Sequence, residues 1–361
     1  MSASNPAPPA RAWADIDLGA IVANARTVAT VSGARLLPMV KADGYGLGAP
    51  AVARALELLD PWGYGVVSVT EALELRRAGI TRPILVVGPA TAAEEGACRE
   101  HGLRPTICDP ATLRRWTSGG QAPFHLGVDT GMGRMGFPWY DDGTLRESLA
   151  HAAASPGWEG IFTHFHSADC DAGATAEQWQ RFQQVLDGMP RRPALVHAAN
   201  SAAALAGGEY AADLVRPGIF LFGGAIPGRP DPAPVARLRA PVVAVRRLRA
   251  GDTVSYGATW RAQRATSVAT IAAGYADGLP RSLSNRGQVE LNGALRPIIG
   301  RVTMDFTMLD LGDGPVSVGD VATIFGSRIS LDDQAEAAGT ISYELLTGLA
   351  RRVSRRYEEA R

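Results

Sequence analysis

Lysine is almost absent from this sequence. Of the 36 Lys and Arg residues in a chain of 361, a single one, Lys41, is a lysine. A coding bias against lysine is one explanation, since arginine replaces it easily on a surface. The other is chemical: a lysine amine can lose its proton and add to a carbonyl, whereas a guanidinium stays protonated. Lys41 is therefore a candidate for a task that arginine cannot perform.

Cysteine, net charge and long apolar runs are also scarce. The three cysteines, Cys98, Cys108 and Cys170, are odd in number and form no CxxC pair, which disfavours a disulfide framework or a zinc site and favours a reducing cytoplasm. The formal net charge is +0, so nothing points to nucleic acid or an anionic membrane. No run has the length of a membrane span, and residues 1–12 lack the apolar segment of a signal peptide. We expect a cytoplasmic protein with a disordered tail over residues 1–12 and a small-molecule substrate.

Apolar, β-branched runs alternate with helical stretches between residues 35 and 224. This alternation predicts parallel βαβ units, and eight of them predict a (β/α)8 barrel, with a doubly wound open sheet as the competing fold. Helices are expected over 49–59, 70–78 and 176–186. We place the eight strands at 36–40, 64–69, 84–87, 106–108, 124–128, 160–164, 195–197 and 214–221.

The residue pattern changes after a Pro/Gly-rich linker at 224–234. The chain beyond the linker is mostly strand, punctuated by turns such as Asn292-Gly293, and a short helix is expected after Ser330. We therefore predict a barrel domain over 13–234 and a C-terminal, mostly-β domain over 235–361, with the first strand, about 13–17, available to pair with the latter. We place the C-terminal strands at 241–248, 253–256, 266–272, 288–291, 298–302, 306–309 and 321–325.

Polar side chains gather at the predicted ends of the barrel strands. Lys41 follows the first strand, His164 and His197 end the sixth and seventh, and Arg216 lies in the eighth. Strand ends on that face form the active sites of such barrels. His164 and His166 could suggest a metal, but strand alternation directs them to opposite faces, and no zinc-type spacing is present, so we predict no metal.

The segment DTGMGRMG at residues 129–136 is a Gly-rich loop that carries Arg134. It lacks the ending of a P-loop. An arginine binds a carboxylate through two parallel hydrogen bonds, which suits an amino-acid substrate.

The motif VKADGYG, residues 40–46, resembles the cofactor-lysine motif of the fold-type III alanine racemases, which depend on pyridoxal 5'-phosphate (PLP). Further blocks match the same family in order, and the resemblance runs from Trp13 to the C-terminus. These blocks are DTGMGRMG, THF, HAANSAA, VRPGI, SYGAT, GYADG and GRVTMD.

The resemblance implies an alanine racemase that supplies D-alanine for peptidoglycan. Lys41 would bind PLP covalently and act as the base on one face of the substrate, and Tyr256 of the partner subunit would be the base on the other, in a homodimer with shared sites. His164 would adjust proton transfer by Tyr256. Arg216 would face the pyridine nitrogen, with His197 behind it. The remaining cofactor residues would be Tyr45, Asn200, Ser201, Gly218, Ile219 and Tyr343.

The substrate carboxylate would be held by Arg134 and the main chain of Met304. Asp305 and Tyr275 would line the site, and Asp169 and Arg281 its entrance.

The sequence departs from the family pattern at Gly127. Many relatives carry there a carbamylated lysine that braces the arginine of DTGMGR, and this chain has no second lysine. We expect another group in that place and hypothesise a bound anion such as chloride. A lesser departure is Thr303, where some relatives carry cysteine.

Three alternatives to this function stay open on the sequence alone. One is a racemase of broader range or one for serine or basic amino acids. Another is a PLP-dependent decarboxylase, against which Arg216 argues because decarboxylases of this plan place a carboxylate at the ring nitrogen. A non-catalytic PLP-binding barrel is disfavoured by the long C-terminal region.

Overall fold

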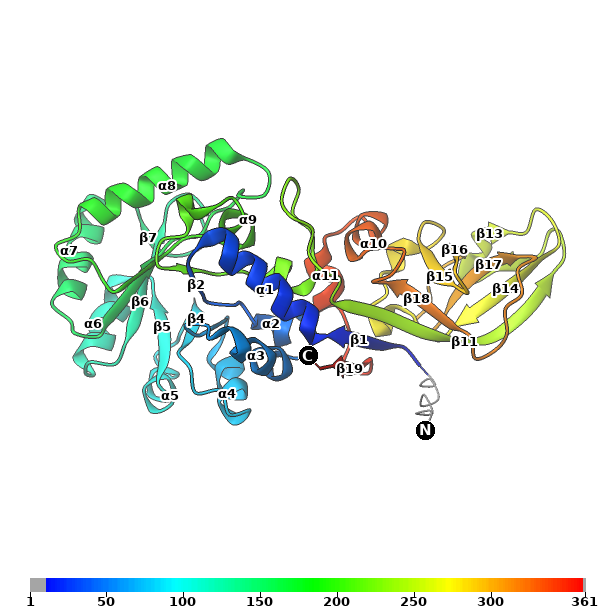
Figure 1. Cartoon of the computed structure of the whole chain (residues 1–361), viewed down its shortest axis with the longest axis horizontal. Coiled ribbons are helices and arrows are strands. Elements are labelled where there is room, and N and C mark those ends of the chain that lie inside the picture. Colours follow the sequence, from blue (N-terminus) through cyan, green and yellow to red (C-terminus); the bar gives the residue numbers. More distant parts are fainter. Residues whose placement is uncertain (1–10, 360–361) are drawn as a thin grey trace. The chain divides into compact units, whose positions relative to one another are not determined.

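In the computed structural model, which describes residues 11–359, eight parallel strands alternate with helices from Arg35 to Val215 (Figure 1). Their hydrogen-bonded order is β2-β10-β9-β8-β6-β5-β4-β3. The strands are β2 (Arg35–Leu36), β3 (Tyr64–Val66), β4 (Ile84–Pro89), β5 (Leu103–Ile107), β6 (Phe124–Asp129), β8 (Trp158–Phe162), β9 (Leu195–His197) and β10 (Leu214–Val215). A short strand, β7 (Phe137–Pro138), adds to β6.

The sheet closes on itself just after β2. Met39 bridges Gly65 in parallel, Gly65 N–H donates to the Pro38 carbonyl at 2.9 Å, and Val40 N–H donates to Gly65 at 2.9 Å. The ends of the strand order therefore meet, and the predicted (β/α)8 barrel is confirmed over the open-sheet alternative. The strands are buried on both faces, as parallel strands covered by helices are.

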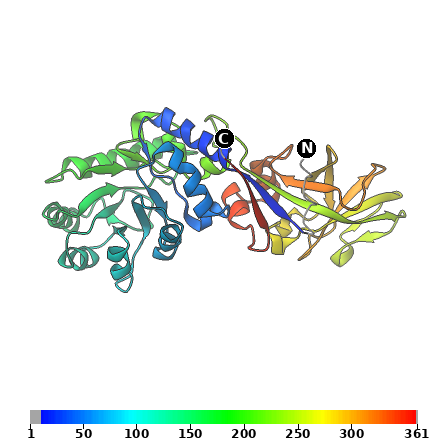
Figure 2. The ribbon, with the colours of Figure 1, turned by 60° about the horizontal axis from the view of Figure 1, so that its bottom comes forward.

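The barrel helices begin at residues that satisfy free main-chain N–H groups. Ser68, Asp109 and Asp171 each accept a hydrogen bond from the N–H three residues on, at the start of three of these helices. Figure 2 shows helices around the outside of the strands. The helices are α1 (Leu18–Ser32), α2 (Lys41–Tyr45), α3 (Ala49–Leu56), α4 (Val69–Arg77), α5 (Glu95–Glu100), α6 (Pro110–Ser118), α7 (Asp142–Ala153), α8 (Ala172–Asp187) and α9 (Ser201–Ala204).

Three strand predictions need correction at their C-terminal ends. The predicted strand 214–221 is β only at Leu214–Val215, and Ile219–Phe222 forms a 3-10 helix, because Pro217 has no N–H for a sheet and Gly218 bends the chain. Likewise β8 ends at Phe162, so His164 lies two residues beyond the strand. The predicted strand 253–256 ends at Val254, and Tyr256 starts a 3-10 turn, η4 (Tyr256–Ala258).

The chain divides into two compact units. One comprises 21–221 and 225–232 and holds the barrel; of the described residues, the other comprises 11–20, 222–224 and 233–359. The first ten residues of the predicted tail lie outside the described part, whereas Ala12 N–H donates to Ala272 at 3.2 Å.

The second unit is built on an eight-stranded sheet, and the long strand β11 connects its parts (Figure 1). Its order is β14-β17-β16-β15-β18-β11-β1-β19, antiparallel except for β1 with β19. These strands are β1 (Trp13–Asp17), β11 (Ala236–Leu248), β14 (Thr266–Ile271), β15 (Gln288–Leu291), β16 (Ala294–Ile299), β17 (Thr307–Gly312), β18 (Val321–Phe325) and β19 (Ser354–Glu358). A two-stranded sheet of β12 (Thr253–Val254) and β13 (Trp260–Arg261) and the helices α10 (Leu331–Ala338) and α11 (Ser342–Thr347) complete the unit. The mostly-β second part of the predicted fold is thereby confirmed.

Within residues 11–359 there is no helix with the length and apolar character needed to cross a membrane.

Candidate active site

Lys41 lies at the C-terminal end of the first barrel strand, where the backbone turns sharply. Residues 42–45 are all left-handed, with φ of 51° at Ala42, 53° at Asp43, 63° at Gly44 and 55° at Tyr45. Such a conformation costs about 1–2 kcal/mol for each residue with a Cβ, so other contacts must hold it. Glu71 accepts from Ala42 N–H at 2.8 Å, and Asp43 accepts from Ala49 N–H at 2.9 Å.

The amine of Lys41 is partly withdrawn from water. Desolvation and the positive charge of Arg134 lower the pKa of Lys41, and the Glu71 carboxylate opposes them. A lowered pKa increases the fraction of neutral, nucleophilic amine near neutral pH.

Arg216 is buried directly after β10 and is held from several segments. Its guanidinium donates to His197 Nδ1 at 2.7 Å, to the Thr163 carbonyl at 2.7 Å and to the Ala198 carbonyl at 2.8 Å. The side chain lies over the ring of Phe162, at 5.2 Å from its centroid. Burial and then the charge of Arg134 lower the pKa of Arg216 to about 9, which leaves the group charged at neutral pH.

His164 faces the same cations. Burial comes first, followed by the charges of Arg216, Arg134 and Lys41, and together they lower the pKa of His164 to about 3. Arg216 Nη2 lies 3.3 Å from His164 Nδ1. A guanidinium can only donate, so Nδ1 accepts and the neutral ring carries its proton on Nε2.

Behind Arg216, a hydrogen-bonded chain crosses the barrel interior. His197 accepts from Arg216 at Nδ1, so its Nε2 donates to His125 Nδ1 at 2.9 Å, and His125 Nε2 then donates to Glu159 at 3.2 Å. Burial lowers the pKa of both histidines. Burial alone would raise the pKa of Glu159, but His125 and Arg104 outweigh it, and the pKa lies below its ordinary value.

Sequence reasoning assigned no role to His125 or Glu159. The signal that could have found His125 is strand alternation, because it occupies the same face of β6 as Gly127. Gly160 stands opposite His125 in the β6–β8 register, and a Cβ there would lie 2.5 Å from His125 Nδ1.

A second group of predicted residues meets near the start of α9. Gly218 N–H donates to Ser201 Oγ at 2.8 Å, and a Cβ at Gly218 would lie 2.2 Å from Tyr45 Oη. Three separate segments therefore converge on a small cradle of hydroxyl and main-chain groups. Asn200 accepts a hydrogen bond from Ala203 N–H at 3.1 Å and caps the start of α9, and its contact with the cofactor stays a prediction.

The loop of Arg134 is anchored by Asp129. That carboxylate accepts from Gly131 N–H at 2.9 Å and Gly133 N–H at 3.0 Å. Within residues 11–359 the exposed Arg134 guanidinium has no hydrogen bond or ion pair.

The space at Gly127 is filled. A Cβ there would lie 3.2 Å from Cys108 Sγ, 3.4 Å from Thr106 Cγ2 and 3.6 Å from Phe162 Cζ. Burial raises the pKa of Cys108 to about 12, so it remains a neutral thiol. These contacts concern only a Cβ at Gly127, and the anion hypothesised beside Arg134 stays a prediction.

The other predicted residues belong to the second unit. Tyr256, Tyr275, Met304 and Tyr343 are exposed there by 73%, 44%, 52% and 44%. Ser255, with φ of 64°, donates to the Arg301 carbonyl at 2.7 Å, which ties the Tyr256 turn to the GRVTMD segment. Arg281 is exposed, as is Asp169 on the barrel unit.

These features define a class: a (β/α)8 barrel with a lysine that follows its first strand and a buried arginine that follows its last, joined in the sequence to a β-rich unit. A family model described as "Alanine racemase, N-terminal domain" matches residues 16–226, and "Alanine racemase, C-terminal domain" matches 235–357. The chain belongs to the alanine racemase family.

Similar proteins cover nearly the whole chain. It is 39% identical to the alanine racemase of Chlorobaculum tepidum over 98% of this chain and 97% of that protein, and 40% identical to that of Salinispora tropica over 96% and 98%. The structure resembles the alanine racemase from D-cycloserine-producing Streptomyces lavendulae, with TM-score 0.91, 32% identity and 97% and 98% coverage. It also resembles the one from Bartonella henselae with covalently bound pyridoxal phosphate, with TM-score 0.89, 32% identity and 97% and 100% coverage.

Proposed function

We propose that this chain interconverts L-alanine and D-alanine, with PLP bound at Lys41, and supplies D-alanine for peptidoglycan. The observation that carries the proposal is the environment of Lys41. The single lysine of the sequence lies at the catalytic end of a barrel, and its pKa is lowered by desolvation and Arg134. A neutral amine is the form that reacts with an aldehyde.

The residues of the barrel unit fit PLP. Lys41 offers an amine for the aldehyde, and Arg216 offers a fixed guanidinium for the pyridine nitrogen. The cradle beside Gly218 offers the hydroxyl groups of Tyr45 and Ser201 for the phosphate. Ile219 and Tyr343 complete the phosphate set, and His197 supports Arg216 from behind. When bound, PLP supplies an electron sink that makes the α-hydrogen of the amino acid acidic.

Arg216 favours racemisation over decarboxylation. Its bonds to His197, Thr163 and Ala198 fix the guanidinium, and the group stays charged with a pKa of about 9. A guanidinium is a poor proton source for a ring nitrogen, whereas a carboxylic acid protonates it readily. The decarboxylase alternative is therefore disfavoured.

Two bases act on opposite faces of the α-carbon in this proposal. Lys41 removes or returns the proton on one face, and Tyr256 of the partner subunit acts on the other. His164 adjusts proton transfer by Tyr256, because its Nε2–H is left to donate a hydrogen bond to the tyrosine oxygen while Nδ1 accepts from Arg216. Tyr256 is 73% exposed on its own unit, as a residue contributed to a neighbouring subunit would be.

The substrate carboxylate is bound by Arg134 and the Met304 N–H. Asp305 and Tyr275 form the wall, and Asp169 and Arg281 the entrance. Alanine is the proposed substrate, and serine and basic amino acids are the alternatives that a substrate panel would separate.

We further infer a cytoplasmic homodimer that binds neither nucleic acid nor membrane. Cys98, Cys108 and Cys170 are free thiols, which suits a reducing compartment, and the formal net charge is +0. The domain boundaries proposed are 13–234 and 235–361, after a tail of residues 1–12.

Complementation between two inactive variants tests shared sites. Lys41→Ala removes the cofactor lysine, and Tyr256→Phe removes the second base, so each alone is expected to be inactive or nearly so. Equal co-expression should restore about a quarter of the unaltered activity, because half of the dimers are mixed and each mixed dimer has one complete site. Polarimetry with L-alanine measures it, and borohydride reduction followed by mass analysis should place the cofactor on Lys41. An inactive mixture would contradict donation of Tyr256 in trans.

A further inference from the structure

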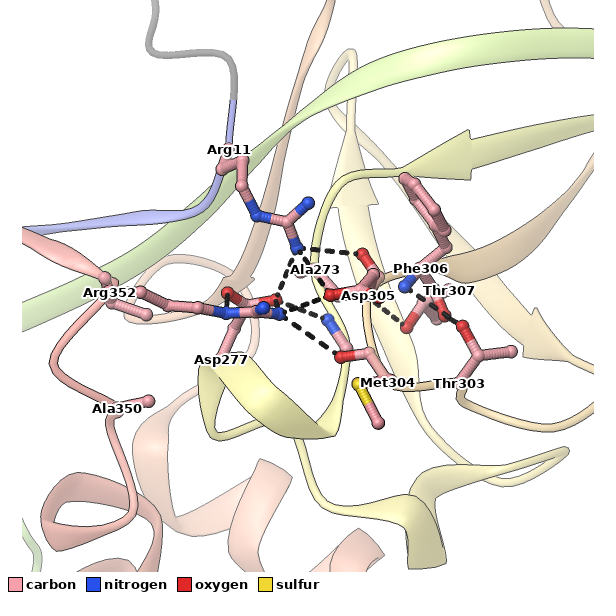
Figure 3. A network of polar contacts seen from close by, with 12 residues as sticks. Arg11, Ala273, Asp277, Thr303, Met304, Asp305, Phe306, Thr307, Ala350 and Arg352 are labelled. Atoms are coloured by element: carbon pink, nitrogen blue, oxygen red, sulfur yellow. Dashed lines mark hydrogen bonds and ion pairs between the residues drawn. The ribbon is translucent and has the colours of Figure 1, made fainter.

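A network of two carboxylates and two guanidinium groups surrounds the Met304–Asp305 turn (Figure 3). Asp277, in the GYADG motif, is only 1% exposed and accepts from Arg352 Nε at 2.7 Å and from Arg352 Nη2 at 2.9 Å. Arg11 donates to the same carboxylate at 3.2 Å. Arg352 and Arg11 also pair with Asp305, at 2.9 Å and 3.5 Å. The charges balance, so the buried carboxylate is paired on two sides.

The network holds the main chain of the turn as well as its side chains. Arg352 Nη2 donates to the Met304 carbonyl at 3.3 Å, and Arg11 donates to the Asp305 carbonyl at 3.2 Å. Asp277 also accepts from Gly274 N–H at 2.9 Å, which fixes the start of the GYADG segment. Figure 3 shows Arg11 and Arg352 approaching Asp277 and Asp305 from different directions.

The GYADG segment pairs with the turn through two consecutive carbonyls. Tyr275 N–H donates to Thr303 at 3.0 Å, and Ala276 N–H donates to Met304 at 3.0 Å. Gly274 makes this approach possible, because a Cβ there would lie 2.3 Å from the Thr303 oxygen. A substituent on that glycine would push the two segments apart.

These two bonds set the direction of the N–H groups of the turn. In a trans peptide the carbonyl and the following N–H point in opposite directions. Since the carbonyls of Thr303 and Met304 face the GYADG segment, the N–H groups of Met304 and Asp305 face away from it. Neither N–H has a partner within residues 11–359, and Met304 is 52% exposed.

We propose that Asp277 and Arg352 are positioning residues for substrate binding: they clamp the Thr303–Phe306 turn so that the Met304 N–H is presented to the substrate carboxylate. The inference rests on the proposed role of Met304 and adds the groups that orient it. Asp277 and Arg352 do not touch the substrate. They act through the Met304–Asp305 main chain.

Steady-state kinetics of Asp277→Asn tests the clamp. The variant keeps the size of the side chain but loses the charge that holds both arginines. KM for L-alanine should rise at least about tenfold, the size expected for one hydrogen bond to a charged group, while kcat stays within about threefold, since the carboxylate is held equally in ground and transition states. The inhibition constant of propionate, a carboxylate without an amine, should rise by the same factor.

Conservative and control variants separate positioning from folding. Arg352→Lys keeps the charge without the two-pronged geometry and should give an intermediate KM. Asp313→Asn is the matched control, because Asp313 also pairs with two arginines of the same unit, Arg247 at 3.0 Å and Arg264 at 3.6 Å, but is exposed. Its KM and propionate inhibition should be unchanged.

The outcomes are distinct. If Asp277→Asn and Arg352→Lys lower the melting temperature or kcat while KM and propionate inhibition remain normal, the residues only stabilise the unit and the proposal is overturned. If Asp277→Asn does not fold, Arg352→Lys and Arg11→Met decide in the same way. A failure of the proposed function would show in the unaltered protein, as no alanine racemisation and no cofactor on Lys41.

Discussion

At the scale of single residues, the chemistry of the candidate site depends on Lys41 being the one lysine of the sequence, while its other cations are arginines. After desolvation, the charge of Arg134 lowers the pKa of Lys41, and the charges of Arg216 and Arg134 lower that of His164. Arg216 itself keeps a pKa of about 9 and stays charged at neutral pH. A second amine in place of these arginines could compete for an aldehyde, whereas a guanidinium cannot. The site therefore has one nucleophilic nitrogen among several cations.

Gly127 is a position in the barrel interior where neighbouring side chains leave little room for a larger residue. A Cβ at this glycine would contact Cys108, Thr106 and Phe162, so the interior is already packed against it. Gly127→Lys should lower the free energy of unfolding by about 1–3 kcal/mol, because added atoms overpack a filled interior. Urea denaturation measures the change.

The control for this substitution is Gly96→Lys on α5, where a Cβ meets no atom within 4 Å. It should change stability by less than about 0.5 kcal/mol, as surface substitutions do. Equal stability of the two variants would contradict the packing argument.

At the scale of elements, the alternation of side chains along β6 and β8 builds the interior of the barrel. His125 and Gly160 are paired across these strands, and the glycine gives the imidazole its space. His125 is thereby placed against His197, which in turn fixes Arg216. The orientation of the Arg216 guanidinium thus depends on Gly160, a residue without a side chain that lies two strands away.

Gly160→Ala tests this dependence. The new Cβ would lie 2.5 Å from His125 Nδ1, so the imidazole must move and its hydrogen bond to His197 is lost. Stability should fall by about 1–3 kcal/mol, and racemisation should slow as Arg216 loses its support. Denaturation and polarimetry measure the two effects.

Gly96→Ala on α5 serves as the comparison and should be neutral or slightly stabilising, since alanine is the better helix former. Normal activity and stability in Gly160→Ala would show that the imidazole adapts without cost.

At the scale of the whole molecule, stability should depend on three histidines of the barrel, of which His125 and His197 are buried and His164 is half-buried. Burial lowers the pKa of His125, His164 and His197 in the folded protein below the ordinary 6.5. Below that pH the unfolded chain binds more protons than the folded one, so the stability is fully present above pH 6.5 and is lost as the pH falls toward the folded pKa values.

We expect the free energy of unfolding to fall by at least about 1.4 kcal/mol per pH unit between pH 6 and 5, which corresponds to more than one proton. Urea denaturation at constant protein concentration gives the slope. Between pH 7 and 8 the slope from these histidines declines toward zero, because the unfolded imidazoles lose their last protons. A flat profile from pH 7 to 5 would mean that the imidazoles titrate normally.

Much of the fold was predictable because each element has a recognisable pattern of apolar and polar residues over a short stretch of sequence. The runs of β2 to β10 stand out as apolar segments between helical stretches, and the linker separates them from the strands of the second unit. One error falls where strand-breaking residues interrupt an apolar run. The apolar segment 214–221 favours a strand, but Pro217 and Gly218 end β10 at Val215.

Part of the candidate site was also predictable. Lys41 was found because it is the only lysine, and Arg216 and His197 because their strand ends meet in a barrel. His125 was missed because a histidine within an apolar strand gives no sign of its partner. Asp277 was missed because a carboxylate in a Gly-rich turn resembles any solvated turn residue.

The sequence by itself determined the alternation of strands and helices, the change to a mostly-strand pattern after the linker, and the position of the one nucleophilic amine. These depend on neighbours within a few residues, and composition and spacing report them directly. Only the tertiary structure decided which polar groups meet. Asp277 pairs with Arg11 across 266 positions, and His125 with His197 across 72. Such contacts depend on strand register and barrel closure, which bring together residues that are far apart in the sequence. The residues near each partner in the sequence do not indicate the contact.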